Sequence, residues 1–212
     1  MSIKVKICGV NSIPAVEAAA NAGADWIGFV FFPPSPRAIT PALASALAAR
    51  ADPGPGRVGL FVAPSEDEVA AVLRQVRLDA LQIYGPAPTL AQLRARFGLP
   101  VWRAVAVGCA GDPPADAGGA DRLVLDAKPP ADASRPGGNA EPFDWSVLRG
   151  WKAPVPWILA GGLTAANVAQ AIGVTGAQAV DVSSGVETAP GLKDPKLIRA
   201  FIGAARSAPT PA

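Results

Sequence analysis

Short hydrophobic runs alternate along the whole chain with longer stretches rich in Ala and Leu. The short runs are rich in β-branched residues and have the length of strands, whereas the longer stretches repeat their apolar residues at helical spacing. Strands that alternate with helices indicate a parallel sheet built from βα units. The pattern predicts eight strands: Ile3–Cys8, Asp25–Phe31, Val58–Val62, Ala80–Ile83, Val101–Val105, Arg122–Asp126, Val155–Leu159 and Ala179–Val182.

Local signals mark where several helices begin and end. A capping side chain followed by proline, or by an acidic residue three positions on, is typical of a helix start. Four starts carry such signals: Thr40-Pro41, Asp194-Pro195, a capping box from Ser65 to Glu68, and a weaker box of Thr89 with Gln92. Gly23 and Gly98 stand where C-caps are expected. The stretch from Gly111 to Gly119 is expected to hold one helical turn or none.

Eight βα units in 212 residues predict a single (β/α)8 barrel over residues 1–206, with a frayed tail over residues 207–212. An open doubly wound sheet would usually carry a G-x-G-x-x-G turn after its first strand. The first turn here reads Cys8-Gly9-Val10-Asn11 instead. The Pro- and Gly-rich stretch from Pro129 to Pro142 lies between a strand and the next helix, so it is interpreted as a long loop.

Composition narrows the possible functions. The formal net charge is only +2 and no basic run occurs, so no nucleic-acid partner is expected. No apolar run reaches the roughly 18 residues of a membrane span and the N-terminus is too polar for a signal peptide, so a cytoplasmic protein without a membrane partner is expected. The two cysteines do not form a disulfide framework, and Cys109 is expected to be a small buried hydrophobe.

The chain contains no histidine. This excludes Ser-His-Asp and Cys-His catalysis and most zinc sites. Proton transfer therefore has to use Cys, Asp, Glu, Lys or Tyr. Active sites of barrels form at the carboxyl ends of the strands. The polar residues and glycines at these ends are Cys8, Arg37, Tyr84, Asp126, Gly161, Gly162, Asp181, Ser183, Ser184 and Gly185.

Two glycine-containing turns, Gly161-Gly162 and Ser184-Gly185, follow the seventh and eighth predicted strands. Glycine lets backbone N–H groups approach an anion closely, and barrels commonly bind a phosphate after these two strands. One such pair alone would be equally consistent with a tight turn. Two pairs at the expected places favour a barrel of the phosphate-binding type.

Cys8 ends the first predicted strand and precedes a glycine. A thiol with an ordinary pKa of about 8.5 must lose its proton to act as a base, so it needs positive surroundings. Lys4 and Lys6 share the strand face of Cys8 and are expected to point inward with it. Because a buried ammonium group needs a partner, we predict that Lys6 pairs with Asp181 inside the barrel.

Asp126 and Arg37 each allow two interpretations. Asp126 ends an apolar strand and is a candidate general acid, which would require an apolar pocket that raises its pKa. It could instead cap a helix or pair with Lys128. Arg37 follows two prolines that stiffen its loop, and a fixed guanidinium suits a carboxylate ligand. The alternative is an ordinary surface arginine.

Seven segments, in order from residue 4 to about residue 201, together resemble the phosphoribosylanthranilate isomerases of tryptophan biosynthesis. They are Lys6–Gly9, Ser35–Arg37, Leu81–Gly85, Leu125-Asp126, Phe143–Trp145, Leu159–Leu163 and Asp181–Glu187. The first and last segments form a highly specific combination. The resemblance implies a (β/α)8 barrel without cofactor or metal. It also implies an Amadori rearrangement that converts N-(5-phosphoribosyl)anthranilate into 1-(2-carboxyphenylamino)-1-deoxyribulose 5-phosphate.

The same resemblance implies a role for each candidate residue. Asp126 would be the general acid that protonates the furanose ring oxygen, and Cys8 the general base that removes the proton from C2 of the sugar. Arg37 would meet the anthranilate carboxylate, and Tyr84 would contact the substrate. Asp181 would hydrogen-bond a sugar hydroxyl, which competes with its pairing to Lys6. The phosphate would lie among Gly161, Gly162, Ser183, Ser184 and Gly185.

The sequence departs from this family at two places. Tyr84 stands where the family usually has His, and the segment from Gly137 to Pro142 replaces the usual Gly-Gly-Thr-Gly of a loop that resembles a mobile lid. Three alternatives stay open: the related histidine-pathway isomerase, indole-glycerol-phosphate synthase, and a non-catalytic phosphosugar-binding barrel. The first is expected to use two aspartates, and the second needs catalytic lysines and a glutamate. The chain is expected to be a monomer or a homodimer.

Overall fold

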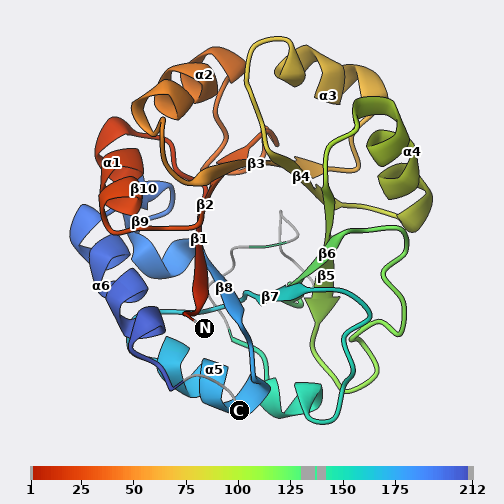
Figure 1. Ribbon diagram of the computed structural model, residues 1–212, viewed down its shortest axis with the longest axis vertical. Helices are drawn as coiled ribbons and strands as arrows, with labels where there is room; N and C mark the ends of the chain where they lie inside the picture. Colours follow the sequence, from red (N-terminus) through yellow and green to blue (C-terminus); the bar gives the residue numbers. More distant parts are fainter. Residues whose placement is uncertain (1, 130–136, 138–141, 210–212) are drawn as a thin grey trace.

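The computed structural model describes residues 2–129, 137 and 142–209. Eight parallel strands close into a barrel in the order β1 to β8, with β8 paired to β1. Figure 1 looks down this barrel and shows the helices around its outside. The (β/α)8 fold predicted from the sequence is therefore confirmed. The strands are β1 Lys4–Cys8, β2 Trp26–Val30, β3 Gly56–Val62, β4 Ala80–Tyr84, β5 Val101–Val107, β6 Arg122–Ala127, β7 Trp157–Leu159 and β8 Ala179–Val182.

The α-helices are α1 Ile13–Asn21, α2 Pro41–Arg50, α3 Glu66–Leu73, α4 Ala87–Phe97, α5 Val168–Thr175 and α6 Pro195–Arg206. They follow β1, β2, β3, β4, β7 and β8. In the described part of the chain, the connection from β5 to β6 contains no helix, and the one after β6 contains only the 3-10 turn η1, Trp145–Leu148. This sector lies at the lower right of Figure 1 and agrees with the prediction for residues 111–119.

Most of the predicted helix boundaries are confirmed. Thr40, Ser65 and Asp194 each cap a helix with a side-chain oxygen, and Ser65 forms a full capping box with Glu68. Gly98 ends α4 in the left-handed conformation. The capping box predicted at Thr89 is wrong. The N-cap is Pro86, whose fixed φ suits a helix start, so Thr89 already lies inside the first turn of α4.

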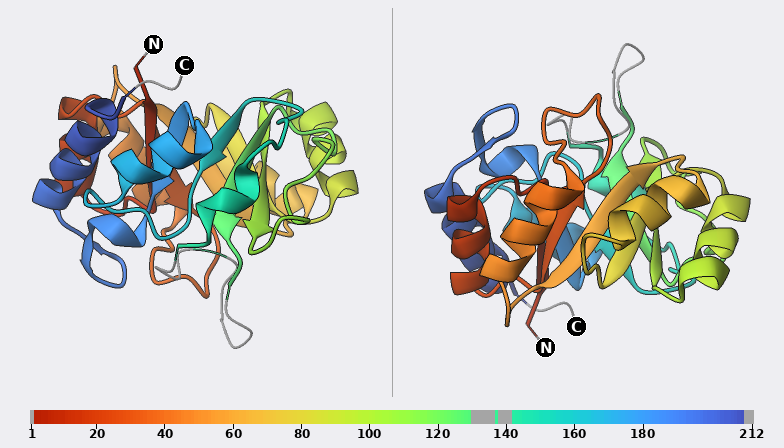
Figure 2. Two further views of the ribbon diagram at one scale, coloured as in Figure 1. Left: turned by 90° about the horizontal axis from the view of Figure 1, so that it is seen from below. Right: turned by 90° about the horizontal axis from the view of Figure 1, so that it is seen from above.

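Two differences concern strands. β7 begins at Trp157 rather than Val155, because Pro156 has no N–H to donate to a neighbouring strand. The antiparallel hairpin of β9, Glu187–Ala189, and β10, Leu192–Lys193, carries no pattern that predicts it. Figure 2 shows that this hairpin and the loop after β2 project from the end of the barrel opposite the start of β1 and the end of α6.

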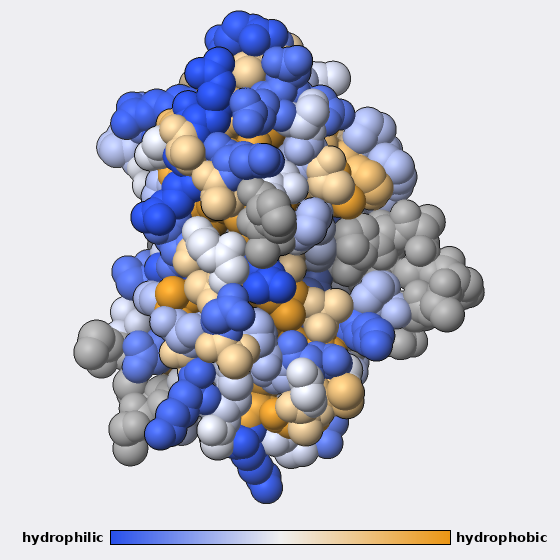
Figure 3. All heavy atoms as spheres, turned by 90° about the vertical axis from the view of Figure 1, so that its right-hand side faces the viewer, coloured by the Kyte–Doolittle hydropathy of each residue, from blue (hydrophilic) through white to orange (hydrophobic). Residues whose placement is uncertain are grey.

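The barrel interior closes at its amino end through stacked side chains. The Arg122 guanidinium lies 5.0 Å from the Trp26 ring and 5.2 Å from the Trp102 ring. Above them, Val58, Ala80, Val124, Ile158 and Ala179 fill the interior with apolar side chains. The outer surface is mainly polar over the side that carries α4, where apolar residues form small patches (Figure 3). None of the described helices is long and apolar enough to cross a membrane.

The amino-terminal rim repeats one arrangement three times. Asp25, Asp79 and Asp121 each stand just before an even-numbered strand. Each carboxylate accepts a hydrogen bond from the backbone N–H of the preceding odd-numbered strand, at 2.9, 2.7 and 2.9 Å respectively. Each aspartate also donates its own backbone N–H to the same residue of that strand. These aspartates therefore hold neighbouring strands together where the barrel begins.

Lys4 belongs to this rim, and its expected inward burial is wrong. Its side chain is 58% exposed and its Nζ lies 2.9 Å from Asp25 Oδ1. Lys4 and Lys6 share a strand face, but Lys4 lies at the first position of β1, where the barrel opens to solvent. Lys6 is one layer deeper and fully buried.

Candidate active site

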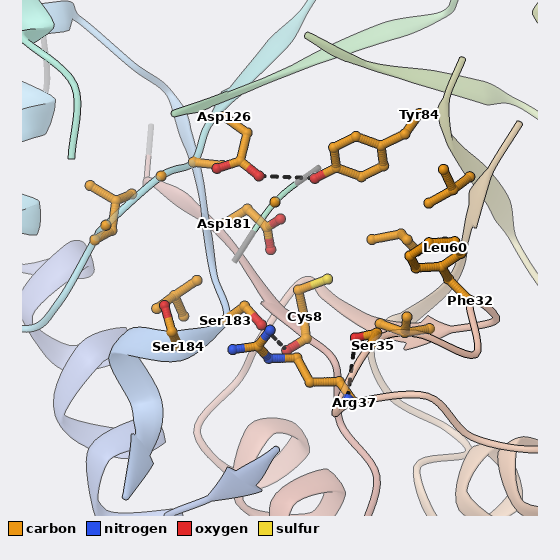
Figure 4. A pocket seen from close by; sticks show the side chains of 18 residues that line it. Cys8, Phe32, Ser35, Arg37, Leu60, Tyr84, Asp126, Asp181, Ser183 and Ser184 are labelled. Carbon is orange, nitrogen blue, oxygen red and sulfur yellow. Dashed lines mark hydrogen bonds between the residues drawn. The ribbon is translucent and has the colours of Figure 1, made fainter. Parts of the chain in front are cut away.

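A pocket of about 650 Å³, part of it open to solvent, lies at the carboxyl ends of the strands. Nine of the ten predicted site residues line it: Cys8, Arg37, Tyr84, Asp126, Gly161, Gly162, Asp181, Ser183 and Ser184. Gly185 does not line it and lies against the backbone of Leu163 instead. Figure 4 shows Cys8, Asp126 and Asp181 pointing into the same space from three different strands.

Asp126 is the second-last residue of β6 and is bonded to Tyr84, which ends β4. The Tyr84 hydroxyl donates to Asp126 Oδ2 at 2.9 Å (Figure 4). Burial raises the pKa of Asp126 to about 6, although the bond from Tyr84 favours the charged form. Burial and the nearby Asp126 carboxylate raise the pKa of Tyr84 well above its ordinary value. Tyr84 therefore stays a proton donor, and Asp126 can hold or release a proton near neutral pH.

Cys8 ends β1 and is 5% exposed. Burial raises the pKa of its thiol, whereas the charge of Lys6 acts in the opposite direction. Apolar side chains of Val30 and Leu60 pack against Cys8. The Cys8 thiol and the Asp126 carboxyl group therefore face one cavity, and each has its own set of neighbouring side chains.

Asp181 lies between these two groups in Figure 4. Its Oδ2 accepts a bond from Lys6 Nζ at 3.0 Å, as the sequence analysis predicted. Its Oδ1 is buried and has no hydrogen-bond partner among the residues that the structure describes. Pairing with Lys6 and hydrogen bonding to a ligand are therefore compatible, because each uses a different oxygen.

Arg37 is not a surface arginine. It is 4% exposed, and its Nε and Nη2 donate to Glu187 at 2.7 and 2.8 Å. Lys193 donates to the same carboxylate at 2.7 Å. Burial opposes ionisation of Glu187, but the bonds from Arg37 and Lys193 hold its pKa below the usual range. This Arg37–Glu187–Lys193 cluster fixes the guanidinium at the edge of the pocket and anchors the β9–β10 hairpin.

The turn after β7 is shaped by glycine and held by one asparagine. Gly161 has a φ of 84°, and a Cβ there would lie 2.8 Å from the Ala127 Cβ, so the turn requires glycine. Asn167 donates to the Gly162 carbonyl at 3.0 Å and accepts from the Thr164 N–H at 2.8 Å. On the neighbouring turn, Lys193 donates to the Ser183 carbonyl at 2.9 Å. Side-chain hydrogen bonds therefore hold both turns at the mouth of the pocket.

Comparison with known proteins places the chain in a family. Residues 5–204 match the family model of N-(5'-phosphoribosyl)anthranilate (PRA) isomerase. The chain belongs to the N-(5'-phosphoribosyl)anthranilate isomerase family. The N-(5'-phosphoribosyl)anthranilate isomerase of Acidiphilium cryptum is 54% identical over 97% of this chain and 99% of its own length. The enzyme of Granulibacter bethesdensis is 53% identical over 98% of this chain and all of its own length.

Solved structures agree with this family. TrpF from Jonesia denitrificans shares 36% identity over the full length of both chains, with a TM-score of 0.83. A phosphoribosyl anthranilate isomerase solved in complex with reduced 1-(o-carboxyphenylamino)-1-deoxyribulose 5-phosphate has a TM-score of 0.80 at 32% identity. That match covers 96% of this chain and 98% of the solved one. The predicted family is confirmed, and the chain is an isomerase of tryptophan biosynthesis.

One of the two departures from the usual family sequence lies beside the general acid candidate. Tyr84 replaces the usual His and is bonded to Asp126. Of the altered segment from Gly137 to Pro142, positions 138–141 lie outside the described residues. Gly137 lines the pocket, and a Cβ there would lie 2.5 Å from the Tyr84 hydroxyl. Glycine at 137 is therefore required while Tyr84 keeps this position.

Sequence reasoning missed three features of this isomerase. Glu187 and Lys193 carry no individual signal, although Glu187 ends the last segment shared with the family. Gly28, directly beside Cys8 on β2, looks like any other strand glycine. The expectation of a buried Cys109 is wrong: this residue is exposed, because it lies in the loop after β5.

Among the described residues, His, Cys, Asp and Glu side chains form no group that could hold a metal ion.

Proposed function

We propose that this isomerase converts N-(5-phosphoribosyl)anthranilate into 1-(2-carboxyphenylamino)-1-deoxyribulose 5-phosphate, with Asp126 as general acid and Cys8 as general base. The observation that carries the proposal is that both side chains face one cavity beside two glycine- and serine-containing turns. An Amadori rearrangement needs one proton donor and one proton acceptor around the sugar, and the pocket offers one of each.

Asp126 acts first. Its carboxyl group donates a proton to the furanose ring oxygen as the bond from that oxygen to C1 breaks, and the anthranilate nitrogen supplies electrons to form a protonated Schiff base. A group with a pKa of about 6 suits this step, because it can be both protonated and a competent donor near neutral pH.

Cys8 acts second. Its thiolate removes the proton from C2, and the electrons of that C–H bond neutralise the Schiff base to give an enolamine. The enolamine then becomes the ketone by losing the proton of its C2 hydroxyl and gaining one at C1. Asp181 Oδ1, which has no hydrogen-bond partner among the described residues, would accept a hydrogen bond from a sugar hydroxyl during these steps.

Two further contacts would orient the substrate. The turns at Gly161-Gly162 and Ser183 to Gly185 would hold the phosphate through backbone N–H groups and serine hydroxyls. Gly185 would contribute through the shape of its turn, since its Cα faces Leu163 rather than the pocket. Arg37 would meet the anthranilate carboxylate while Glu187 holds its guanidinium plane.

A fluorescence assay tests the proposal, because anthranilate derivatives fluoresce. Substrate made in situ should lose its fluorescence on addition of the protein. Cys8→Ser and Asp126→Asn should each slow turnover by at least ~10²-fold, the low end for loss of a general acid or base. Cys109→Ser is the matched control, because this exposed thiol lies outside the pocket, and it should keep full activity.

Each result bears on one assignment. Wild-type turnover by either Cys8→Ser or Asp126→Asn would remove that residue from the mechanism. Lack of turnover by the unsubstituted protein would favour a non-catalytic phosphosugar-binding barrel. Turnover of the histidine-pathway aminoaldose instead would favour that related isomerase.

The chain is further proposed to act as one domain over residues 1–206, with a tail over 207–212, in the cytoplasm. A monomer or a homodimer is proposed. A structure of monomers generated from the dimeric phosphoribosylanthranilate isomerase of Thermotoga maritima is similar to this chain, at 32% identity and a TM-score of 0.79. Light scattering during size-exclusion chromatography distinguishes the two states.

A further inference from the structure

We propose that Lys6 is a positioning residue of this isomerase, whose buried ammonium group favours the thiolate of Cys8 against the effect of burial. The proposal rests on the proposed role of Cys8 as general base. It adds a residue that lies beside the thiol and acts on it rather than on the substrate, and it makes Lys6, Cys8 and Asp181 one functional unit.

The barrel brings Lys6 and Cys8 together on one face of β1. They are two residues apart and therefore point to the same side. Gly28 pairs with Cys8 on the neighbouring strand β2. A Cβ built on Gly28 would lie 2.9 Å from Cys8 Sγ and 3.2 Å from Lys6 Nζ. The sulfur and the ammonium group thus converge on space that only glycine leaves open.

Lys6 carries its charge inside the barrel. It is fully buried, and a buried cation costs free energy unless opposite charge and hydrogen bonds compensate it. Burial alone would lower the pKa of Lys6, but Asp181 and Cys8 outweigh burial and raise it. These neighbours therefore favour the ammonium form of Lys6. Its bond to Asp181 at 3.0 Å accounts for one of its three protons.

Lys6 is the neighbour with the strongest stabilising effect on the thiolate. The groups that face Cys8 from other elements are Asp181 on β8, Lys193 on β10, Tyr84 on β4 and Arg37 after β2. Asp181 disfavours the thiolate by its own negative charge. Lys193 favours it more weakly, and its Nζ is bonded to Glu187 and to the Ser183 carbonyl.

Asp181 therefore has two opposite effects. It holds Lys6 in place beside the sulfur through Oδ2, and its charge repels a thiolate. Asp181→Asn keeps a side-chain oxygen that can accept from Lys6 and removes only the negative charge. Removing Lys6 and neutralising Asp181 in this way should therefore shift the ionisation of Cys8 in opposite directions. A purely structural role for this buried pair would not produce shifts of opposite sign.

The test measures the thiol directly and without substrate. In a Cys109→Ser background Cys8 is the sole cysteine, so its rate of alkylation by iodoacetamide as a function of pH follows its thiolate. Lys6→Met should move the titration to higher pH and slow alkylation at pH 8 by at least about tenfold. The matched control is Lys4→Met, on the same strand face but 58% exposed, and it should leave the titration unchanged.

Asp181→Asn supplies the second arm. It should move the titration to lower pH and speed alkylation, and it keeps the test decisive if Lys6→Met does not fold. An unchanged titration in folded Lys6→Met, or slower alkylation in Asp181→Asn, would overturn the proposal. Full isomerase activity in Cys8→Ser would instead overturn the role of Cys8, whatever the titrations show, so the two failures are distinguishable.

Discussion

The two rims of the barrel both carry ion pairs, but they use charge differently. At the amino end, Asp25, Asp79 and Asp121 bond to backbone N–H groups of the neighbouring strands and to partly exposed basic side chains. At the carboxyl end, Asp126 and Asp181 are 7% exposed, and one Asp181 oxygen has no partner among the described residues. The first rim satisfies its charges and the second leaves some unsatisfied.

This difference separates stability from chemistry along the same strands. Asp121 and Asp126 stand at opposite ends of β6, only five positions apart. The first stabilises the start of the neighbouring strand. The second is buried at a cost that leaves its pKa near 6, which a proton donor requires. Barrels of this kind keep their chemistry at the carboxyl end because loops there can supply unusual environments without disturbing the strands.

The largest effect on stability is expected from Glu187→Gln at the carboxyl rim. Glu187 is 3% exposed and neutralises both Arg37 and Lys193. The variant leaves Arg37 facing a neutral amide and removes the group that supports the charge of Lys193, whose pKa burial already lowers to about 8. The free energy of unfolding should therefore fall by about 3–5 kcal/mol. Urea denaturation measures this loss. A loss below about 1 kcal/mol would show that the attraction within the cluster barely exceeds the cost of removing its charges from water.

Asp126→Asn should raise the free energy of unfolding at neutral pH, and the size of this gain should depend on pH. Because burial raises the folded-state pKa of Asp126 to about 6, its contribution to stability is present below the unfolded-state pKa and is lost as pH rises through 6. The variant should therefore gain about 2–3 kcal/mol relative to wild type between pH 4 and pH 7.5. Parallel denaturation series at both pH values test this; a constant difference would contradict a buried, uncompensated carboxylate.

Asp121→Ala should give the smallest change in the free energy of unfolding. It removes the partner of the Val101 N–H, at 2.9 Å, and of Arg94, at 2.8 Å. A loss of about 1–2 kcal/mol is expected, with kcat unchanged. Glu17→Ala is the control, since its exposed pair with Arg50 should contribute less than about 1 kcal/mol. A fall in kcat for Asp121→Ala would undo the separation of the two rims.

Much of the fold followed from local pattern. Hydrophobic periodicity located all eight strands, and capping signals at Thr40, Ser65 and Asp194 located helix starts, because both depend on nearby residues alone. The error at Thr89 arose where two local signals competed and the proline determined the start. The β9–β10 hairpin was not predictable, because its strands of three and two residues are too short to show a periodic pattern.

The site was predictable where its residues end strands. Position along a strand defines the side and the end on which a residue lies, so the expected pairing of Lys6 with Asp181 is confirmed. Depth within the barrel was not predictable, and Lys4 was wrongly expected to be buried. Glu187 was missed as the partner of Arg37, because the two are 150 positions apart and no local pattern connects them.

The sequence by itself determined the family, the order of the elements and which polar residues reach the catalytic rim. Those properties depend on composition, periodicity and local turns. Only the tertiary structure decided how each group ionises and what it bonds: Tyr84 to Asp126, Glu187 to Arg37, and Lys6 to the space beside Cys8 that Gly28 leaves open. Burial and charge at these positions are set by side chains from distant strands, which meet only when the barrel closes.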